Sequence, residues 1–390
     1  MISHDTYLTI RPNVLNWDIM KRQFFCVIMA GGKGTRFWPL SRSQRPKQLL
    51  KILSPKTLIR ETAERVLPLS GPKQTLVVTV AEQLRRLARE LPMLPRRNFL
   101  AEPQGRNTAP CIGLAALEVV ARDPEGIMLV LPADHWVADV VAFRRSLKAA
   151  AELASASDDL VTIGIQPNYP ETGYGYIMKG KPLGGTAPAG AYQVKQFKEK
   201  PSETMARQLI RRGSLWNSGI FVWRASTLLE LMHRYQPAIA RGLSKISQGA
   251  KGNSLADSNS RLRGLLAREY NKMPNLSIDH AVLEKAGSEG KVLTLKASFG
   301  WSDIGSWAAV HRMMDRDEYG NAGNGKWLGL GAKNCLIHAR DRLVVLLGVQ
   351  YAVVVDTPDA LLVGDLRRSQ EVRELVEELK QKGYGGYTVK

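Results

Sequence analysis

The sequence predicts an α/β protein whose doubly wound, mainly parallel sheet is followed by a small C-terminal β-helix. Short, almost continuously apolar segments recur at 25–29, 76–80, 127–131 and 160–165, as parallel strands covered on both faces require. Segments with helical spacing lie between them, and repeated β-α alternation of this kind is typical of a doubly wound sheet. After Gly320, strand-like pieces recur at spacings of eight or nine residues.

Two of the intervening helices can be placed individually. Residues 108–120 carry apolar side chains at helical spacing behind Asn107 or Thr108, either of which can cap a helix, and residues 141–153 fill the next gap. In such a sheet the ligand crevice lies beyond the carboxyl ends of the strands. We therefore expect functional residues in the loops that follow strands.

The C-terminal segment begins with G-N-A-G-N-G-K at 320–326, and its strand-like pieces start near Leu336, Val344, Val353 and Leu361. This rhythm fits a short β-helix, and a small meander is the alternative. From Ser369 onward an amphipathic helix is expected, because four apolar residues fall at i, i+3, i+4 and i+7: Val372, Leu375, Val376 and Leu379. We expect this face to pack on its own domain, with a homodimer contact as the alternative.

Three domains follow from this reading: an N-terminal extension at 1–23, a catalytic domain at 24–319, and the β-helix with its helix at 320–390. The extension matches no pattern, and Met20 stands directly before the first strand. A chain beginning at Met20 is therefore expected to keep its activity.

The composition of the 390 residues is that of a globular protein, with 44% hydrophobic and 23% charged residues. The longest apolar stretch, 343–355, is interrupted by Gly348 and Gln350 and is too short to span a membrane. The first twenty residues carry no secretory pattern. We expect a cytoplasmic protein without a membrane partner.

The three cysteines, Cys26, Cys111 and Cys335, are far apart and lie in apolar segments, which indicates reduced core thiols. The six histidines are isolated, so a zinc centre is not expected. The 55 Lys and Arg against 36 Asp and Glu give a net charge of +19, which indicates a polyanionic ligand or, as the alternative, reflects the salt or pH inside the cell. Because the cations occur as scattered pairs and form no long basic run, nucleic acid is not the expected partner.

The first predicted strand leads directly into a glycine-rich turn that contains Gly31, Gly32 and Gly34. Glycine lets backbone N–H groups approach a polyanion closely. Cations surround the turn: Arg36, Arg42, Arg45 and Lys47. The spacing matches neither the Walker pattern nor G-x-G-x-x-G. The sequence therefore predicts a phosphate-binding loop of another type.

The whole string, G-G-x-G-T-R followed by W-P-L-S-R and P-K-Q, resembles sugar-1-phosphate nucleotidylyltransferases, most closely the mannose-1-phosphate guanylyltransferases. The resemblance extends from residue 25 to about 380. It implies a Rossmann-like nucleotidyltransferase domain, a left-handed β-helix, and transfer of GMP from GTP to α-D-mannose 1-phosphate. It also implies that the loop wraps the nucleoside triphosphate, through Gly31, Gly32, Gly34 and Thr35, with Arg36 and Lys47 as catalytic residues.

Two aspartates are the metal candidates. Asp134 follows the strand 127–131 within L-P-A-D-H, and Asp303 lies in F-G-W-S-D-I-G-S-W between Trp301 and Trp307. An aspartate after a strand is more often a helix cap. Both motifs match the family, whose metal ligands carry over onto these two residues. Mg²⁺ suits such a pair, because it accepts a few carboxylate oxygens together with substrate phosphate oxygens.

Three further segments together describe a polar sugar site, and one of them, E-K-P, which by itself would be a surface turn, resembles the family's sugar-phosphate element. E-T-G-Y-G-Y-I contains Gly175, whose backbone would approach the sugar, and E-K-P contains Glu199 for a hydroxyl and Lys200 for the sugar phosphate. N-S-G-I-F adds Asn217, whose amide can donate to and accept from hydroxyls.

The segment 102–110, E-P-Q-G-R-N-T-A-P, resembles the guanine-binding element of the family and assigns the base to Asn107 and Thr108. Capping of the following helix is the alternative role, and the two are compatible.

Three other functions stay open from the sequence. The enzyme could use another sugar or base; the chain could be a non-catalytic nucleotide-sugar sensor, which would not need two metal ligands; or it could bind nucleic acid. Some relatives carry a cupin-type isomerase domain behind the transferase. We expect neither that domain nor isomerase activity in this chain.

Overall fold

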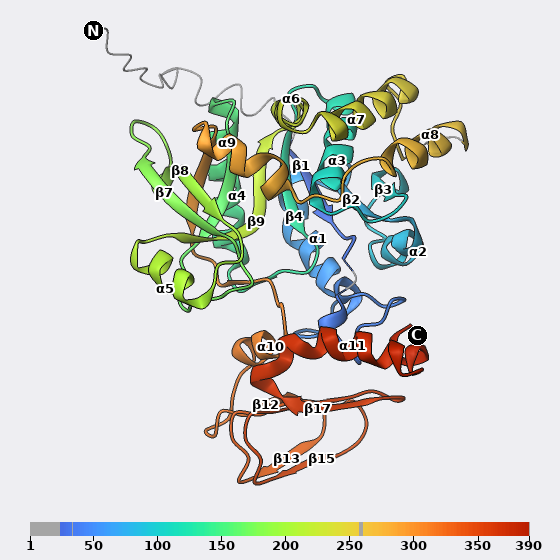
Figure 1. The fold of residues 1–390 in the computed structure, drawn as a ribbon, viewed down its shortest axis with the longest axis vertical. Coiled ribbons are helices and arrows are strands. Elements are labelled where there is room, and N and C mark those ends of the chain that lie inside the picture. Colours follow the sequence, from blue (N-terminus) through green and yellow to red (C-terminus); the bar gives the residue numbers. More distant parts are fainter. Residues whose placement is uncertain (1–23, 33, 257–259, 390) are drawn as a thin grey trace. The chain divides into compact units, whose positions relative to one another are not determined.

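A computed structural model describes residues 24–32, 34–256 and 260–389 (Figure 1). The predictions for residues 1–23 lie outside these ranges. The described chain forms two compact units that are interleaved along the sequence: residues 24–29, 63–132 and 137–301 form the first, and residues 30–62, 133–136 and 302–389 form the second. The division into sequence domains at residue 320 stays our proposal.

The first unit is built on a sheet that has nine strands within the described residues, in the order β3-β2-β1-β4-β9-β6-β10-β8-β7. The bounds are β1 (Phe24–Met29), β2 (Thr75–Val80), β3 (Phe99–Glu102), β4 (Ile127–Pro132), β6 (Leu160–Ile165), β7 (Tyr176–Pro182), β8 (Ala191–Lys198), β9 (Leu215–Arg224) and β10 (Val292–Ala297). The four strands predicted from the sequence correspond to β1, β2, β4 and β6. Only β8 and β9 run against the other strands of this sheet, so the mainly parallel sheet is confirmed.

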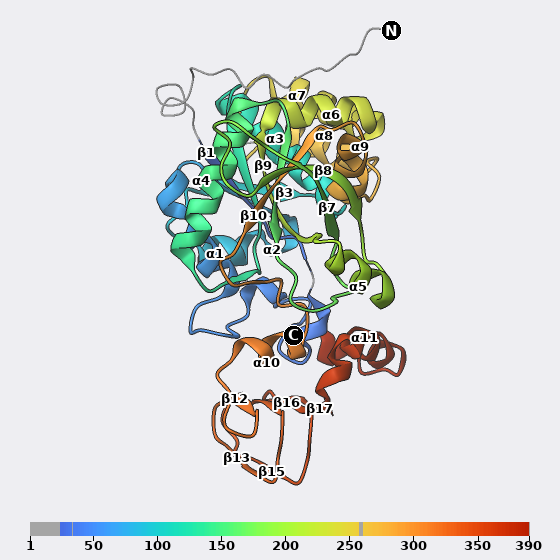
Figure 2. The ribbon, with the colours of Figure 1, turned by 90° about the vertical axis from the view of Figure 1, so that its left-hand side faces the viewer.

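Helices cover both faces of this sheet. They are α1 (Leu58–Ser70, which begins in the second unit), α2 (Ala81–Glu90), α3 (Thr108–Arg122), α4 (Val140–Ala156), α5 (Glu203–Arg211), α6 (Ala225–Tyr235), α7 (Pro237–Ala250), α8 (Ser260–Tyr270) and α9 (Glu284–Ser288), the last preceded by a π-helical turn at Asp279–Leu283. The helices predicted at 108–120 and 141–153 are α3 and α4. Figure 2 shows α4 and α6 on opposite sides of the sheet, and both contact β9.

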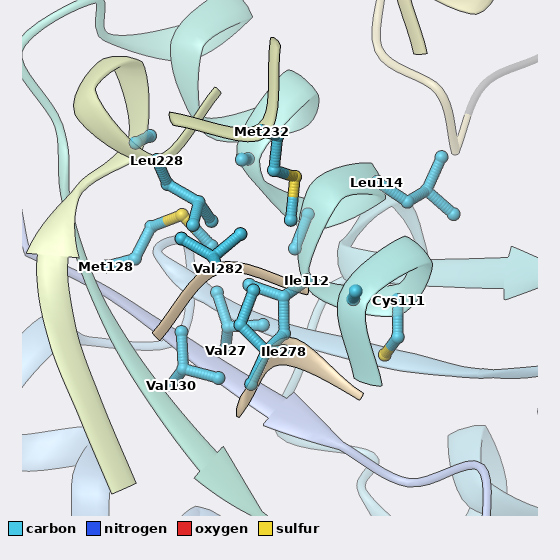
Figure 3. Close-up of a cluster of buried hydrophobic side chains, with 14 of the residues drawn as sticks. Val27, Cys111, Ile112, Leu114, Met128, Val130, Leu228, Met232, Ile278 and Val282 are labelled. Atoms are coloured by element: carbon cyan, nitrogen blue, oxygen red, sulfur yellow. The ribbon is translucent and has the colours of Figure 1, made fainter. Parts of the chain in front are cut away.

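The main hydrophobic core lies between the sheet and α3, α6 and α7. Val27 and Val130 point from the strands toward Ile112 of α3 and Met232 of α6 (Figure 3). Fully burying an aliphatic side chain of this size contributes roughly 1.5–3 kcal/mol. All three cysteines are free and buried, as predicted, and burial raises the pKa of the Cys26 thiol to about 12.

The second unit contains the predicted β-helix. Its strands are β12 (Ala322–Asn324), β13 (Trp327–Leu330), β14 (Leu336–His338), β15 (Val344–Leu347) and β16 (Ala352–Asp356). The strand expected near Leu361 is β17 (Leu361–Asp365), but it pairs antiparallel with β16 and therefore adds no further turn to the β-helix. Ala322 pairs in parallel with Leu336, and Leu336 with Val353, so successive turns are 14 and 17 residues apart. A second parallel pair, β13 with β15, supplies the other strand of each turn, which explains the spacing of eight or nine residues. Parallel pairing excludes the meander, and the hand of the β-helix stays a prediction.

The remaining elements of the second unit surround its core. They are α10 (Trp307–Met313), α11 (Val372–Gln381), and short 3-10 turns at Thr35–Phe37, Lys47–Leu49, Leu366–Glu371 and Gly385–Thr388, while β5 (Trp136–Val137) and β11 (Trp301–Ser302) lie where the chain passes between units. Val372 and Val376 of α11 are buried in a cluster with Phe37 and Trp307. The apolar face of α11 therefore packs on its own unit, as expected, and a homodimer stays a prediction.

Among the described residues, no helix combines the length and the apolar character that crossing a bilayer requires.

Candidate active site

In the second unit, the glycine-rich turn packs directly against the backbone of Lys47. Gly34 has φ 60°, and a Cβ at this position would overlap the Lys47 side chain and lie 2.9 Å from its backbone nitrogen. Only glycine satisfies both the dihedral angle and the space. Gln48 Nε2 donates to the carbonyl of Ala30 at 2.9 Å, which anchors the start of the turn where β1 ends. Gly31 is partly exposed and Gly32 is exposed, so their backbones are accessible to a ligand.

Lys47 joins the two predicted metal ligands. Its ammonium lies 2.9 Å from Asp134 Oδ2 and donates to the backbone carbonyl of Asp303 at 2.5 Å. The Lys47 side chain is only 9% exposed, and the Phe37 ring lies beneath its ammonium at 5.7 Å. Lys47, Asp134 and Asp303, which are up to 256 positions apart in the sequence, therefore lie together around the Lys47 ammonium. The sequence prediction that Asp134 and Asp303 are close together is consistent with this geometry.

The Asp134 carboxylate is held in its ionised form. Burial raises its pKa, but the ammonium of Lys47 and the nearby His135 together outweigh that effect, so the net pKa lies below the ordinary value. The side chain remains 29% exposed, so the carboxylate is accessible to a cation.

A tight turn presents Asp303. Ile304 has φ 47°, its N–H donates to Ser302 Oγ, and a Cβ on Gly305 would lie 2.9 Å from Asp303 Oδ2. Ser306 then caps α10 by accepting from the N–H of Ala309. Glycine at 305 therefore lets the backbone curl around the carboxylate.

The side chain of Arg36, a second cation of this loop, is held by a residue in the C-terminal part of the same unit. It follows Thr35 in the first 3-10 turn, and its Nη1 donates to Gln370 Oε1 at 2.7 Å. The same stretch is held at Trp38, whose Nε1 donates to the carbonyl of Tyr387. Residues far along the chain thus fix the position of the guanidinium.

In the first unit, four predicted sugar-site residues meet. The Asn217 N–H donates to the carbonyl of Gly175 at 2.8 Å, and a Cβ on Gly175 would lie 2.5 Å from Glu199 Oε2. Lys200 has φ 42° and its ammonium pairs with Glu199 Oε1 at 2.6 Å, with the Lys200 side chain 65% exposed. Because Gly175 has no Cβ, its backbone can pack directly against the side chains of Glu199 and Asn217.

The Asn217 amide corrects one expectation. Its Oδ1 accepts from Thr162 Oγ1 at 3.1 Å and from the Gly219 N–H at 3.3 Å, and its Nδ2 donates to Asp279 Oδ1 at 2.8 Å. The oxygen already has two protein donors, so the amide can offer a ligand only its second N–H. We expected it both to donate and to accept.

Asn107 and Thr108 both have structural roles at the start of α3. Asn107 Oδ1 accepts from the Thr108 N–H, which confirms the capping role, and its backbone is held at φ 64° and ψ −170°. Thr108 Oγ1 accepts from the Ile278 N–H at 2.8 Å. The backbone conformation of Asn107 is unusual for a residue other than glycine, and conformations of this kind are common at functional sites. Contact with a base stays a prediction.

Two family models match this chain. One, described as nucleotidyl transferase, matches residues 25–319, and a second, described as a MannoseP isomerase/GMP-like beta-helix domain, matches residues 325–379. The chain belongs to the nucleotidyl transferase family. The family resemblance stated from the sequence is confirmed.

Individual relatives of this nucleotidyl transferase are similar over most of its length. A Vibrio cholerae protein named putative mannose-1-phosphate guanylyltransferase is 39% identical, over 93% of this chain and 76% of that protein. A Klebsiella pneumoniae mannose-1-phosphate guanylyltransferase is 38% identical, over 91% of this chain and 74% of that protein. A crystal structure from Thermus thermophilus, described as a mannose-1-phosphate geranyltransferase, has a TM-score of 0.81 at 34% identity and covers 92% of this chain and 99% of its own.

Sequence reasoning missed three polar residues of this nucleotidyl transferase: Thr162, Asp279 and Gln370. Thr162 lies within a buried strand and Gln370 precedes an amphipathic helix, so neither pattern indicates a functional role. Asp279 stands in S-I-D-H before a helical segment, where an aspartate is usually interpreted as a cap. Its one signal in the sequence is a polar pair, Asp279-His280, set between apolar residues.

Proposed function

We propose that this protein transfers GMP from GTP to α-D-mannose 1-phosphate, yielding GDP-mannose and pyrophosphate. The observation that carries the proposal is the Lys47 ammonium, which lies beside a glycine turn, forms an ion pair with the Asp134 carboxylate and donates to the backbone carbonyl of Asp303. The relatives at 38% and 39% identity, which bear the name mannose-1-phosphate guanylyltransferase, support the choice of base and sugar.

The chemistry asks mainly for alignment and charge neutralisation. The attacking sugar-phosphate oxygen is already anionic at neutral pH, so no general base is needed, and no covalent intermediate is required. In our proposal Arg36 and Lys47 bind the triphosphate and stabilise charge on the attacked α-phosphate and on the departing pyrophosphate. The backbone of Gly31, Gly32, Gly34 and Thr35 supplies N–H donors to the same phosphates.

The chain's carboxylates fit a Mg²⁺ ion that arrives with the nucleotide. Within the described residues, no group of three or more His, Cys, Asp or Glu side chains could hold a metal without other ligands. Mg²⁺ is commonly bound through one or two carboxylates and substrate phosphates, so a pair of aspartates is sufficient. Asp134 and Asp303 would hold it, and bound Mg²⁺ would neutralise phosphate oxygens. Lys47 and His135 lower the pKa of Asp134, so its carboxylate is ionised, as metal binding requires.

The sugar phosphate would be bound by residues of the first unit. We assign Lys200 to the phosphate, because its ammonium is largely exposed and its backbone is fixed by a hydrogen bond from its N–H to the Tyr174 carbonyl. Glu199 and the free N–H of Asn217 would bind sugar hydroxyls, and Gly175 would offer its backbone. Asn107 and Thr108 would border the guanine.

The test is a substrate matrix. The protein is incubated with MgCl₂, each of the four nucleoside triphosphates and a panel of sugar 1-phosphates, and pyrophosphate release is measured. We expect release with GTP and mannose 1-phosphate, and strong loss in an Asp303→Asn control. Turnover with a different pair would replace the base or sugar assignment, and no turnover with any pair by folded protein would favour a nucleotide-sugar sensor.

A further inference from the structure

The carboxylate of Asp279 faces the proposed sugar-site residues, and the proposed reaction does not yet use it. It opens the π-helical turn at Asp279–Leu283, a conformation that is rare and frequent at functional sites. Its Oδ1 accepts from Asn217 Nδ2 at 2.8 Å, although the two residues are 62 positions apart in the sequence. A residue in this place can act on Asn217, on the substrate, or on both.

Asp279 completes the orientation of the Asn217 amide. Thr162 Oγ1 and the Gly219 N–H both donate to the amide oxygen. A flipped amide would place its NH₂ group against the Gly219 N–H and its oxygen against the Asp279 carboxylate. With Oδ1 filled and one N–H given to Asp279, one N–H remains. The direction of that N–H is fixed by the bonds of the amide to Thr162, Gly219 and Asp279. A group held in this way can recognise a ligand rigidly.

The second oxygen of Asp279 is the more informative atom. In the described part of the chain no side chain donates to Oδ2, and no lysine or arginine forms an ion pair with this carboxylate. Glu199 differs, because Lys200 neutralises it at 2.6 Å. Burial and the nearby Glu199 raise the pKa of Asp279 to about 6. Besides Asn217, the backbone N–H of Asp279 itself donates to this carboxylate. A partly buried carboxylate with so few donors is stabilised by an additional O–H donor.

The polar groups around Gly175 suit the hydroxyls of a sugar ring. A Cβ on Gly175 would lie 2.5 Å from Glu199 Oε2 and 3.4 Å from Asn217 Cβ, so only bare backbone fits beside them. Two carboxylates and one amide N–H thus converge near a glycine backbone. Sugar hydroxyls, which both donate and accept, match this combination of groups.

We propose that Asp279 is a specificity-determining residue for the sugar: its Oδ2 accepts a hydrogen bond from one ring hydroxyl, while its Oδ1 holds Asn217 so that the amide donates to another. This inference rests on the proposed function. It adds a residue that selects for the pattern of ring hydroxyls and that has no contact with the reacting phosphates.

Two substitutions separate the two roles. Asp279→Asn keeps an acceptor for Asn217 Nδ2 but replaces the second acceptor with a donor, whereas Asp279→Ala removes both. For Asp279→Asn we expect kcat/KM for mannose 1-phosphate to fall about 10- to 100-fold, as loss of a hydrogen bond to a charged group implies. The KM for GTP should not change. Glu284→Gln, at an exposed carboxylate on α9, is the matched control and should retain full activity.

Deoxy analogues identify the hydroxyl. Wild type and Asp279→Asn are assayed with the 2-, 3-, 4- and 6-deoxy forms of mannose 1-phosphate. The wild-type enzyme should discriminate most strongly against one analogue, and for that analogue alone the two proteins should have the same kcat/KM. If Asp279→Asn matches wild type on every substrate, or loses activity equally on all of them, the recognition role is overturned. Failure of the proposed function itself would appear earlier, as absent turnover of GTP and mannose 1-phosphate by wild type.

Discussion

Glu102 couples the stability of the first unit to pH. It ends β3, is 2% exposed, and accepts a hydrogen bond from the Tyr270 hydroxyl at 2.5 Å. Burial raises the pKa of Glu102 to about 7, although the bond from Tyr270 acts in the opposite direction. Burial also raises the pKa of the Tyr270 phenol, which therefore remains a donor. Glu102→Gln keeps the acceptor oxygen for Tyr270 and removes the titrating group.

The sign and size of the effect follow from these values. Since the pKa is higher in the fold than in the unfolded chain, the folded protein binds more protons between the two values. The contribution to stability is full below the ordinary pKa of 4.5 and is lost as the pH rises through about 7. At 1.36 kcal/mol per pH unit, the loss amounts to about 3 kcal/mol.

Urea denaturation at pH 4, 5, 6, 7 and 8 measures this loss. The free energy of unfolding of the wild type should decrease with pH by about 3 kcal/mol more than that of Glu102→Gln. Glu82→Gln, at an exposed glutamate of α2, is the control and should follow the wild type. Parallel curves for wild type and Glu102→Gln would refute the reasoning, because the carboxyl would then titrate alike in both states.

Three further predictions concern the site. Asp303→Asn should leave the circular dichroism spectrum unchanged and cost roughly 3 kcal/mol of transition-state stabilisation in pyrophosphate release; a folded variant at full rate would contradict the metal role. Lys200→Ala should weaken mannose 1-phosphate binding by calorimetry and spare GTP, and the reverse result would reassign this lysine. Gly34→Ala should reduce kcat and stability, because the new Cβ meets the Lys47 backbone at φ 60°, whereas Gly32→Ala, which meets nothing within 4 Å, should be nearly neutral for stability. Equal stability losses for the two glycines would show that packing against Lys47 is not the cause.

The parts of the fold that could be predicted are those that depend on the order of residues within one short segment. Strands buried on both faces produce continuous apolar runs, so β1 and β4 are recognisable, and Asp134 follows from its place at the end of β4. The order of the strands is not local. Nothing in residues 215–224 indicates that β9 lies antiparallel between β4 and β6.

The residues of the candidate site likewise fall into those that a local motif predicts and those that only the folded chain brings together. Gly34 and Lys47 lie in one continuous motif and could be assigned together. Asp279 meets Asn217 across 62 residues, and Gln370 meets Arg36 across 334, so only the folded chain reveals these pairs. The donor-only character of Asn217 likewise depends on Thr162, which a sequence pattern presents as an ordinary strand residue.

The backbone that follows the glycine turn is fastened by residues near the other end of the chain. The N–H groups of Ser43 and Gln44 donate to the carbonyls of Thr388 and Val389, and Arg42 forms an ion pair with Asp359. The partners of Arg42, Ser43 and Gln44 lie more than three hundred residues further along the chain. In a nascent chain these contacts therefore cannot form until residues 359–389 have been made, and only then is the backbone after the glycine turn held in place.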